Sequence, residues 1–370
     1  MLDVALKMLR ELTSHSYEAY IVGGFVRDYI LGIESKDIDI TTSATPKDIR
    51  NIFKNKCLPN EEYGSVIVMF NGIRFEITTF RQDMEYFDNR HPSSINYVND
   101  LYTDLLRRDF TINSICMDEN GTIIDYLGGQ EDINNRIIKT IGNSNDKFRD
   151  DALRILRAIR FATLLDFKLS DDVIRAIRKN RHAVKKISFY RRKQELDKLF
   201  SSPNRDNGIE LILHFHMEKD LGIKNLKNVY HSSVNSSIGV WSMLDVDSGY
   251  IFNKNELDLI NKTRKAVDLN NFDSIILYKY GLYVNSCAAS IKGLDLKELT
   301  KRYNELIIKS REDIDIDSDT IMKILNKEPG KYIKNIYEDL EEKILYNKIE
   351  NKREVLKKYI LDNYGNWEGD

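Results

Sequence analysis

The 370-residue sequence predicts an α+β protein with a mixed β-sheet at its N-terminal end and helices in the rest of the chain. Two observations predict this fold class. The first 125 residues alternate short β-rich runs with amphipathic segments, and Asn71-Gly72 between two such runs is a strong hairpin signal. From about Phe148 the apolar residues follow the helical period, and strand signals become sparse.

The elements of the N-terminal part follow from local patterns. An apolar stripe predicts the first helix, and a helix is expected directly after Gly23-Gly24. Thr45-Pro46 is a cap followed by proline at the first helical position, so another helix should start there. The predicted segments are a helix over 2–12, a strand over 18–22, a helix over 46–54, a hairpin over 65–80 and a second hairpin pairing 112–117 with 122–124.

Composition limits the possible classes of protein. The net charge of −2 and the 31% of charged residues indicate neither a nucleic-acid-binding protein nor a disordered one. The three cysteines are too far apart for a zinc site and fit no disulfide framework. No segment approaches a membrane span, and the N-terminus has no signal-peptide pattern. We therefore expect a cytoplasmic protein that binds no membrane.

Two aspartates in one short run predict a metal site. Asp37 and Asp39 are two residues apart, so on a strand both carboxylates project from one face while Ile38 and Ile40 enter the core. Mg²⁺ typically takes one or two carboxylates and completes its coordination with water and phosphate oxygens. Glu76, on the polar face of a neighbouring strand, is a candidate third ligand. Taken alone, such a pair is more often solvated or capping.

A glycine pair predicts a phosphate site. Gly23-Gly24 lies where a strand ends and a helix begins, so backbone N–H groups and the helix dipole are available to an anion. Arg27 on the first turn adds positive charge. A lone Gly-Gly at such a junction is usually just a tight turn, but the aspartate pair that follows favours the phosphate interpretation.

Five motifs in order extend this constellation. They are Gly23-Gly-Phe-Val-Arg-Asp28, Asp37-Ile-Asp39, Arg107-Arg-Asp-Phe-Thr-Ile-Asn113, Asp125-Tyr-Leu-Gly-Gly129 and Asp150-Asp-Ala-Leu-Arg-Ile-Leu-Arg-Ala-Ile-Arg160. With them the chain resembles a class II CCA-adding tRNA nucleotidyltransferase of the bacterial type, in the same family as poly(A) polymerase. The resemblance is dense from about Tyr20 to Lys198 and weak from 201 to 327.

The resemblance implies an activity, a domain order and further site residues. It implies template-independent addition of C, C and A to the tRNA 3′ end from CTP and ATP, with Mg²⁺ and without any implied protein partner. The domains would be a catalytic head (1–137), a neck (138–200), a body (201–320) and a tRNA-binding tail (321–370). The implied nucleotide-binding residues are Gly24, Arg27, Arg108, Asp109, Asn113, Asp151, Arg154, Arg157 and Arg160, while Asp37 and Asp39 are the implied catalytic and metal-binding residues.

The proposed base selector also has a physical basis. Asp151 and Arg154 are three residues apart, so on one helix they share a face and offer an acceptor beside donors. Cytosine and adenine both present an amino donor next to a ring-nitrogen acceptor, whereas uracil and guanine present the reverse. A surface ion pair is the ordinary alternative. Two departures from the family are Asp150 and Tyr190, where glutamate is usual.

Other features remain open at this stage. Residues 201–208 have the composition of a linker, and 314–319 of a solvated connection. The segment 81–106 resembles the flexible loop of complete CCA enzymes. The alternatives are a poly(A) polymerase or an enzyme adding only CC or only A, a small-molecule nucleotidyltransferase, and a catalytically inactive RNA-binding relative. The last two fit less well, because a small-molecule enzyme needs no base selector and both Asp37 and Asp39 are present.

Overall fold

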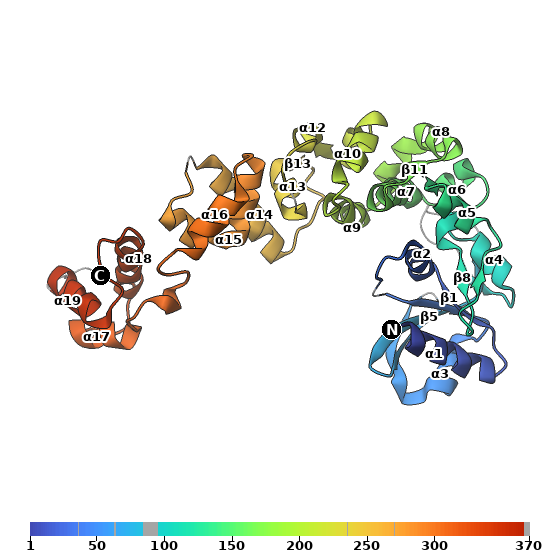
Figure 1. The fold of residues 1–370 in the computed structure, drawn as a ribbon, viewed down its shortest axis with the longest axis horizontal. Coiled ribbons are helices and arrows are strands. Elements are labelled where there is room, and N and C mark those ends of the chain that lie inside the picture. The colour runs from blue at the N-terminus through green and yellow to red at the C-terminus, as the bar shows by residue number, and fades with distance from the viewer. Residues whose placement is uncertain (36, 63, 84–94, 235, 270, 366–370) are drawn as a thin grey trace. The chain divides into compact units, whose positions relative to one another are not determined.

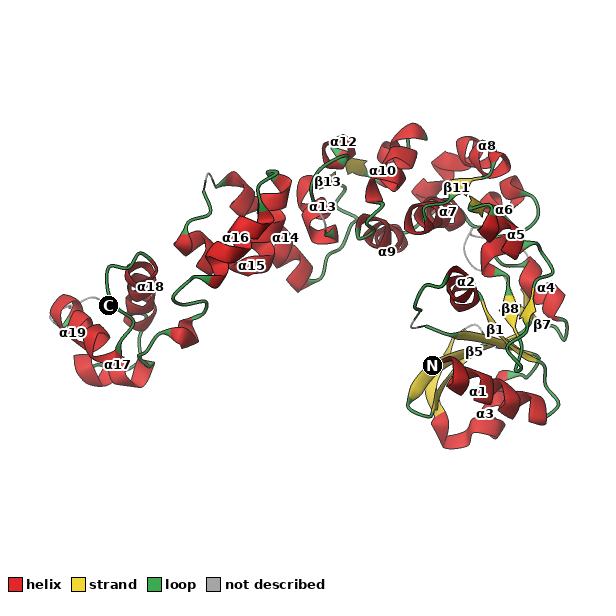
Figure 2. Cartoon of the chain, in the orientation of Figure 1, coloured by secondary structure: helices red, strands yellow, loops and turns green. Residues whose placement is uncertain are grey.

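The computed structural model describes residues 1–35, 37–62, 64–83, 95–234, 236–269 and 271–365. The chain forms two compact units, Met1–Ile223 and Lys224–Asp370. Strands are concentrated in the first unit and helices make up most of the second, which confirms the predicted α+β class (Figure 2). The finer division into head, neck, body and tail stays a prediction.

A mixed sheet organises the N-terminal half of the first unit. In the described chain its strand order is β3-β4-β5-β2-β1-β8-β9, and only β2 and β5 of the neighbouring pairs run parallel. The strands are β1 (Ala19–Val22), β2 (Asp39–Thr42), β3 (Cys57–Glu62), β4 (Ser65–Phe70), β5 (Ile73–Thr79), β8 (Cys116–Met117) and β9 (Ile123–Ile124). Separate two-stranded pairs are β6 (Arg81–Asp83) with β7 (Ile95–Tyr97) and β10 (Ile137–Ile138) with β11 (Lys168–Leu169).

Local sequence signals account for most of these elements. Asn71 and Gly72 both have positive φ, 49° and 78°, as a tight hairpin turn requires, and β4 pairs with β5 on either side of them. Thr45 caps its helix by accepting the N–H of Asp48, with Pro46 at the first helical position. The second predicted hairpin exists as β8 and β9, but extending its first arm back to 112 was wrong, because Thr111–Asn113 forms a 3₁₀ turn.

Helices cover both faces of the sheet. Figure 1 shows α1 (Leu2–Ser14) and α3 (Pro46–Phe53) on one side of the strands and α2 (Gly24–Leu31) on the other. The buried stripe of α1 includes Ala5, Leu9 and Leu12, as its apolar spacing predicts. Because α2 starts directly after β1, its N-terminal end lies at an end of the sheet.

The rest of the first unit is mainly helical. Its helices are α4 (Leu101–Leu106), α5 (Gly129–Asn134), α6 (Ser144–Asp150), α7 (Leu153–Leu165), α8 (Asp171–Asn180), α9 (Phe189–Phe200), α10 (Arg205–His214) and α11 (Glu218–Leu221). The linker interpretation of 201–208 was wrong. Ser202, Arg205 and Gly208 are buried, and Gly208 lets α10 pack closely against Thr163 of α7.

The second unit is built from helices around two clusters of buried side chains. Its helices are α12 (Leu226–Val229), α13 (Ser237–Met243), α14 (Lys254–Asp268), α15 (Ser274–Ile291), α16 (Leu296–Asn304), α17 (Ser318–Leu325), α18 (Tyr332–Leu345) and α19 (Arg353–Tyr364), with strands β12 (Ile223–Lys224) and β13 (Asp245–Val246). One cluster includes Leu277 and Ala288, the other Ile336 and Leu340. The segment 314–319 is not simply solvated, because Ile314 and Ile316 join the second cluster.

Three further expectations concern the thiols, membrane spans and the long loop. All three cysteines are free thiols; Cys116 and Cys287 are buried, and Cys57 is half-buried. In the described ranges, no helix combines the length and the apolar character that crossing a membrane requires. The central part of the predicted flexible loop, 84–94, lies outside the described residues.

Candidate active site

The turn between β1 and α2 brings two glycines next to two arginines. Gly23 has φ 83° and ψ −132°, a conformation that side chains disfavour, and its N–H donates to the Ile115 carbonyl at 3.3 Å. A Cβ at Gly23 would lie 3.7 Å from Nη1 of Arg108, and one at Gly24 3.7 Å from Nη2 of Arg27. The N-terminus of α2 therefore faces guanidinium groups, as a site for an anion requires.

Two of the three predicted acidic ligands, Asp39 and Glu76, lie on neighbouring strands. Asp39 is the first residue of β2, and its parallel partner on β5 is Glu76. Asp37 precedes the strand, so the prediction that both aspartates lie on it was only half right, although both remain exposed while Ile38 and Ile40 are buried. In the described part of the chain, no three acidic, histidine or cysteine side chains are preassembled as a metal site.

The surroundings of Asp39 raise its pKa. Although part of its side chain is exposed, desolvation by the neighbouring protein raises the pKa most, and the carboxylates of Glu76 and Asp37 raise it further, whereas the Arg108 guanidinium lowers it. Asp39 therefore lies where negative charges repel one another and one arginine partly compensates. A bound cation would relieve this repulsion, and carboxylate oxygens are the ligands that a hard divalent cation prefers.

Asp104, which sequence reasoning missed, fixes the two arginines that follow α4. Its carboxylate is fully buried and accepts from Nε of Arg107 at 2.9 Å and from Nη2 of Arg108 at 3.2 Å. Burial by itself would raise the pKa of Asp104, but the two guanidinium groups bring it below its usual range. The i, i+4 spacing of Asp104 and Arg108 was the available signal. Nε of Arg108 is buried without a partner among the described residues.

A hydrogen-bonded chain joins the glycine turn to α7. Arg27 donates from Nη1 to Oδ1 of Asn113 at 2.7 Å, and Nδ2 of Asn113 donates to Oδ1 of Asp109 at 3.2 Å. The other oxygen of Asp109 accepts from Nε of Arg157 at 2.6 Å. Burial by itself would raise the pKa of Asp109, but Arg157 and these hydrogen bonds hold it below its usual range. Four predicted site residues are thus in one network.

Arg160 belongs to the same face of α7 but is enclosed. Its Nε donates to Oε2 of Glu195 on α9 at 2.5 Å, and only 7% and 8% of the two side chains are exposed. Desolvation and the nearby charge of Arg157 outweigh the effect of Glu195 and lower the pKa of Arg160. The structure therefore gives Arg160 a buried ion pair that links α7 to α9.

The predicted base-selecting pair does not lie on one helix. Helix α6 ends at Asp150, Asp151 is extended with φ −138° and ψ 106°, and α7 begins at Leu153. The expectation of a shared helical face was wrong, because the Asp151 carboxylate accepts the N–H of Leu153 at 2.9 Å and so ends one helix and starts the next. Its other oxygen lies 3.8 Å from Nη2 of Arg191.

Arg154 instead holds the backbone that leads to Arg108 and Asp109. Its Nη2 donates to the Arg107 carbonyl at 3.0 Å and its Nη1 to the Lys147 carbonyl at 3.3 Å. Lys147, also missed by sequence reasoning, donates from Nζ to the carbonyls of Leu106 and Arg108 at 2.7 and 3.1 Å. Side chains from α6 and α7 thus hold the C-terminal end of α4.

Comparisons with known proteins identify the relatives of this chain. Three family models match: "Poly A polymerase head domain" over 19–139, "Probable RNA and SrmB- binding site of polymerase A" over 166–221 and "tRNA nucleotidyltransferase domain 2 putative" over 252–360. The CCA-adding enzyme of Ligilactobacillus salivarius is 33% identical over 95% of this chain and 94% of its own length. That of Staphylococcus haemolyticus is 33% identical over 98% of both chains.

The chain belongs to the family of bacterial CCA-adding enzymes. Among solved structures of that family, the Bacillus stearothermophilus CCA-adding enzyme in complex with CTP aligns with a TM-score of 0.81 and 29% identity, covering 97% of this chain and 96% of the other. The Thermotoga maritima CCA-adding enzyme complexed with tRNA has the same fold, with a TM-score of 0.65, 21% identity and coverage of 97% and 94%.

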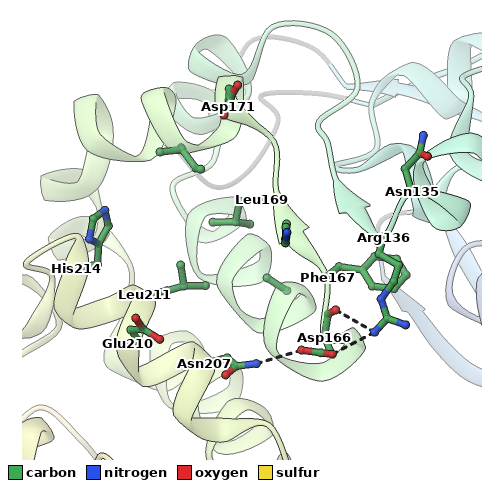
Figure 3. A pocket seen from close by; sticks show the side chains of 13 residues that line it. Asn135, Arg136, Asp166, Phe167, Leu169, Asp171, Asn207, Glu210, Leu211 and His214 are labelled. Atoms are coloured by element: carbon green, nitrogen blue, oxygen red, sulfur yellow. Dashed lines mark hydrogen bonds and ion pairs between the residues drawn. The ribbon is translucent and has the colours of Figure 1, made fainter.

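Of two cavities in this CCA-adding family member, one is lined by a predicted site residue and the other is not. A polar cavity of about 210 Å³ includes Arg107, Lys147 and Arg154 in its lining. A larger groove of about 830 Å³ has Phe167 and Leu211 among its lining residues (Figure 3). None of the predicted site residues lines the larger groove. The larger of these two cavities is therefore separate from the predicted site.

Proposed function

We propose that the chain adds C, C and A in turn to the 3′ end of tRNA, using CTP twice and ATP once. Two observations support this activity together: full-length relatives named CCA-adding enzymes, and the network that joins the glycine turn, Asp109 and Arg157. In each cycle the tRNA 3′-hydroxyl attacks the α-phosphorus of the nucleotide. One P–O bond forms there as the bond to pyrophosphate breaks. We expect this nucleotide addition to take place in the cytoplasm, where tRNA matures.

Different residues of the chain would bind the triphosphate and the ribose. The backbone at Gly23 and Gly24 together with Arg27 and Arg108 binds the triphosphate, and the buried Asp104 keeps Arg108 oriented toward it. Asp109 and Asn113 are in the same hydrogen-bonded network as Arg27 and would contact the ribose. Charged partners fixed before binding lose little freedom when the nucleotide arrives, which favours both affinity and alignment.

Asp37 and Asp39 would hold Mg²⁺, with Glu76 beside them. The fit rests on the donor chemistry and on the raised pKa of Asp39, which desolvation raises most and the charges of Glu76 and Asp37 raise further. When bound, such an ion supplies charge neutralisation for phosphate oxygens and activates the attacking hydroxyl. These carboxylates would hold the cation at the N-terminal end of β2, a central strand of the sheet.

Asp151 and Arg154 are the proposed base readers. An acceptor beside donors matches the Watson–Crick edges of cytosine and adenine and leaves buried polar groups unpaired with uracil or guanine. Arg154 keeps N–H donors for a base, because Nη1 and Nη2 each donate only one hydrogen bond to a carbonyl. The 3.8 Å contact of Asp151 with Arg191 orients the acceptor.

The decisive test is incorporation by the purified chain with Mg²⁺ and a tRNA that ends before CCA. It is supplied with CTP alone, ATP alone and both. Two C residues from CTP, and a single A added only afterwards, would support the proposal. Arrest at CC, addition of A only to CC-ended tRNA, or a long A tail would each contradict it and identify a partial enzyme or a poly(A) polymerase. No addition at all would identify an inactive relative.

A further inference from the structure

The ring of Phe161 on α7 contacts several positive charges at once. The guanidinium carbon of Arg160 lies 3.9 Å from the ring centroid, that of Arg27 5.2 Å and that of Arg157 5.3 Å. Arg27 comes from α2, whereas Arg157 and Arg160 come from α7 itself. Only 7% of Phe161 is exposed, so these contacts are largely shielded from water. The ring therefore connects the glycine turn to α7.

Three converging cations repel one another unless something compensates. Each has one acidic partner: Asp28 for Arg27, Asp109 for Arg157 and Glu195 for Arg160. The acids hold Arg157 and Arg160 from one side only, whereas Arg27 also donates to Oδ1 of Asn113. The face of an aromatic ring carries negative charge in its quadrupole and attracts cations most strongly where water is excluded. Phe161 thus supplies an attraction that brings the three groups together without adding a formal charge.

The hydrogen bonds of Arg157 and Arg160 show why such a support matters. In the described part of the chain each forms its hydrogen bond through Nε, to Asp109 and Glu195 respectively, and neither Nη1 nor Nη2 has a partner. A single hydrogen bond leaves a guanidinium group free to rotate about it. Contact with the ring removes that freedom. It still leaves both Nη atoms of Arg157, whose side chain is 33% exposed, available to phosphate oxygens. An additional acid would instead occupy those donors and lower the positive charge.

We propose that Phe161 is a positioning residue for triphosphate binding, whose ring orients the guanidinium groups of Arg27, Arg157 and Arg160 toward a bound nucleotide. The proposal rests on the proposed function, since the resemblance to CCA-adding enzymes is what implies that these arginines bind the nucleotide. Phe161 itself touches no reacting atom. It also packs edge-on against Phe110, at 5.8 Å between centroids, which fixes the ring next to Asp109.

The test replaces Phe161 by a series of fluorinated phenylalanines in the full chain. Fluorine withdraws charge from the ring face step by step while shape and apolar character are almost unchanged. The dissociation constants for CTP and for ATP with Mg²⁺ are measured by calorimetry. We expect them to rise in graded steps, by roughly threefold to thirtyfold at the trifluoro ring, which is the range a shielded cation–π contact implies.

Controls separate positioning from packing. The same series at Phe148, a fully buried phenylalanine for which the described residues show no cation over the ring, should leave both constants unchanged. Dissociation constants that stay unchanged across the fluorinated series at Phe161 would overturn the proposal. This would hold even if Phe161→Leu weakened binding, because leucine also changes packing. An equal rise at Phe148 would overturn it too.

The binding readout is independent of tRNA. If the unmodified chain binds CTP but adds nothing to tRNA, the proposed function fails while the Phe161 series still decides the positioning role. If it adds C and A and the series is flat, only the positioning role fails. If it binds neither nucleotide, both fail.

Discussion

Replacing Gly208 by alanine should destabilise the first unit. A Cβ there would lie 2.3 Å from Oγ1 of Thr163 and 2.9 Å from two carbon atoms of Leu199. Overpacking of this kind costs about 1–3 kcal/mol, and alanine in a helix interior regains about 0.5–1 kcal/mol over glycine. We therefore expect a net loss of up to about 2.5 kcal/mol, which corresponds to a fall in Tm of up to about 10 °C for a unit of this size.

The assay is thermal unfolding followed by circular dichroism, with amide exchange of peptides from α7 and α10 as the local readout. Tryptophan fluorescence is unsuitable, because both tryptophans of the chain lie beyond residue 223. As a control, Gly208→Ala is repeated in a Thr163→Ala background, where the closest atom is absent and the loss should be smaller. A Tm that rises with Gly208→Ala in the unaltered background would refute the packing argument and restore the linker interpretation.

Three other substitutions test the site. Asp39→Asn should abolish nucleotide incorporation while Tm stays equal or rises, because it removes a charge that Glu76 repels; incorporation surviving with Mg²⁺ would contradict the metal assignment. The lowered pKa of Asp109 means that its stabilisation is present above the unfolded carboxyl pKa of about 3.9 and is lost as the pH falls through the folded value. Urea midpoints between about pH 3 and 7 should therefore fall less on acidification in Asp109→Asn, and parallel curves would refute this. Arg154→Lys should reduce the preference for CTP over UTP in kcat/KM about 10–100-fold, as for loss of one hydrogen bond to a charged group; an unchanged ratio would make Arg154 purely structural.

Features that depend on neighbouring residues could be predicted from the sequence. The Asn71-Gly72 turn and the Thr45 cap need only local backbone chemistry, and the structure contains both. The alternation that buries Ile38 and Ile40 and exposes Asp37 and Asp39 also follows from local periodicity, although the strand begins only at Asp39.

Features that depend on residues far apart in the chain could not be predicted from the sequence. Asp104 accepts a hydrogen bond from Thr41, 63 residues away, and Arg160 pairs with Glu195, 35 residues away. No spacing rule connects such positions. The composition of 201–208 indicated a linker, yet Gly208 is there because it is small enough to let two helices touch. Turn-forming composition does not distinguish a flexible segment from a close helix contact.

The hydrogen bonds of Arg154 bear on its proposed role in base selection. On a continuous helix, Asp151 and Arg154 would form an independent pair that reads a base. In the structure, Arg154 holds the carbonyl of Arg107, directly before the residues proposed to bind triphosphate and ribose. A guanidinium group has five N–H donors, so two hydrogen bonds to carbonyls leave others for a base. If Arg154 binds a base as proposed, its movement would pull on the Arg107 carbonyl, and we would then expect the choice of base to affect the positions of Arg108 and Asp109.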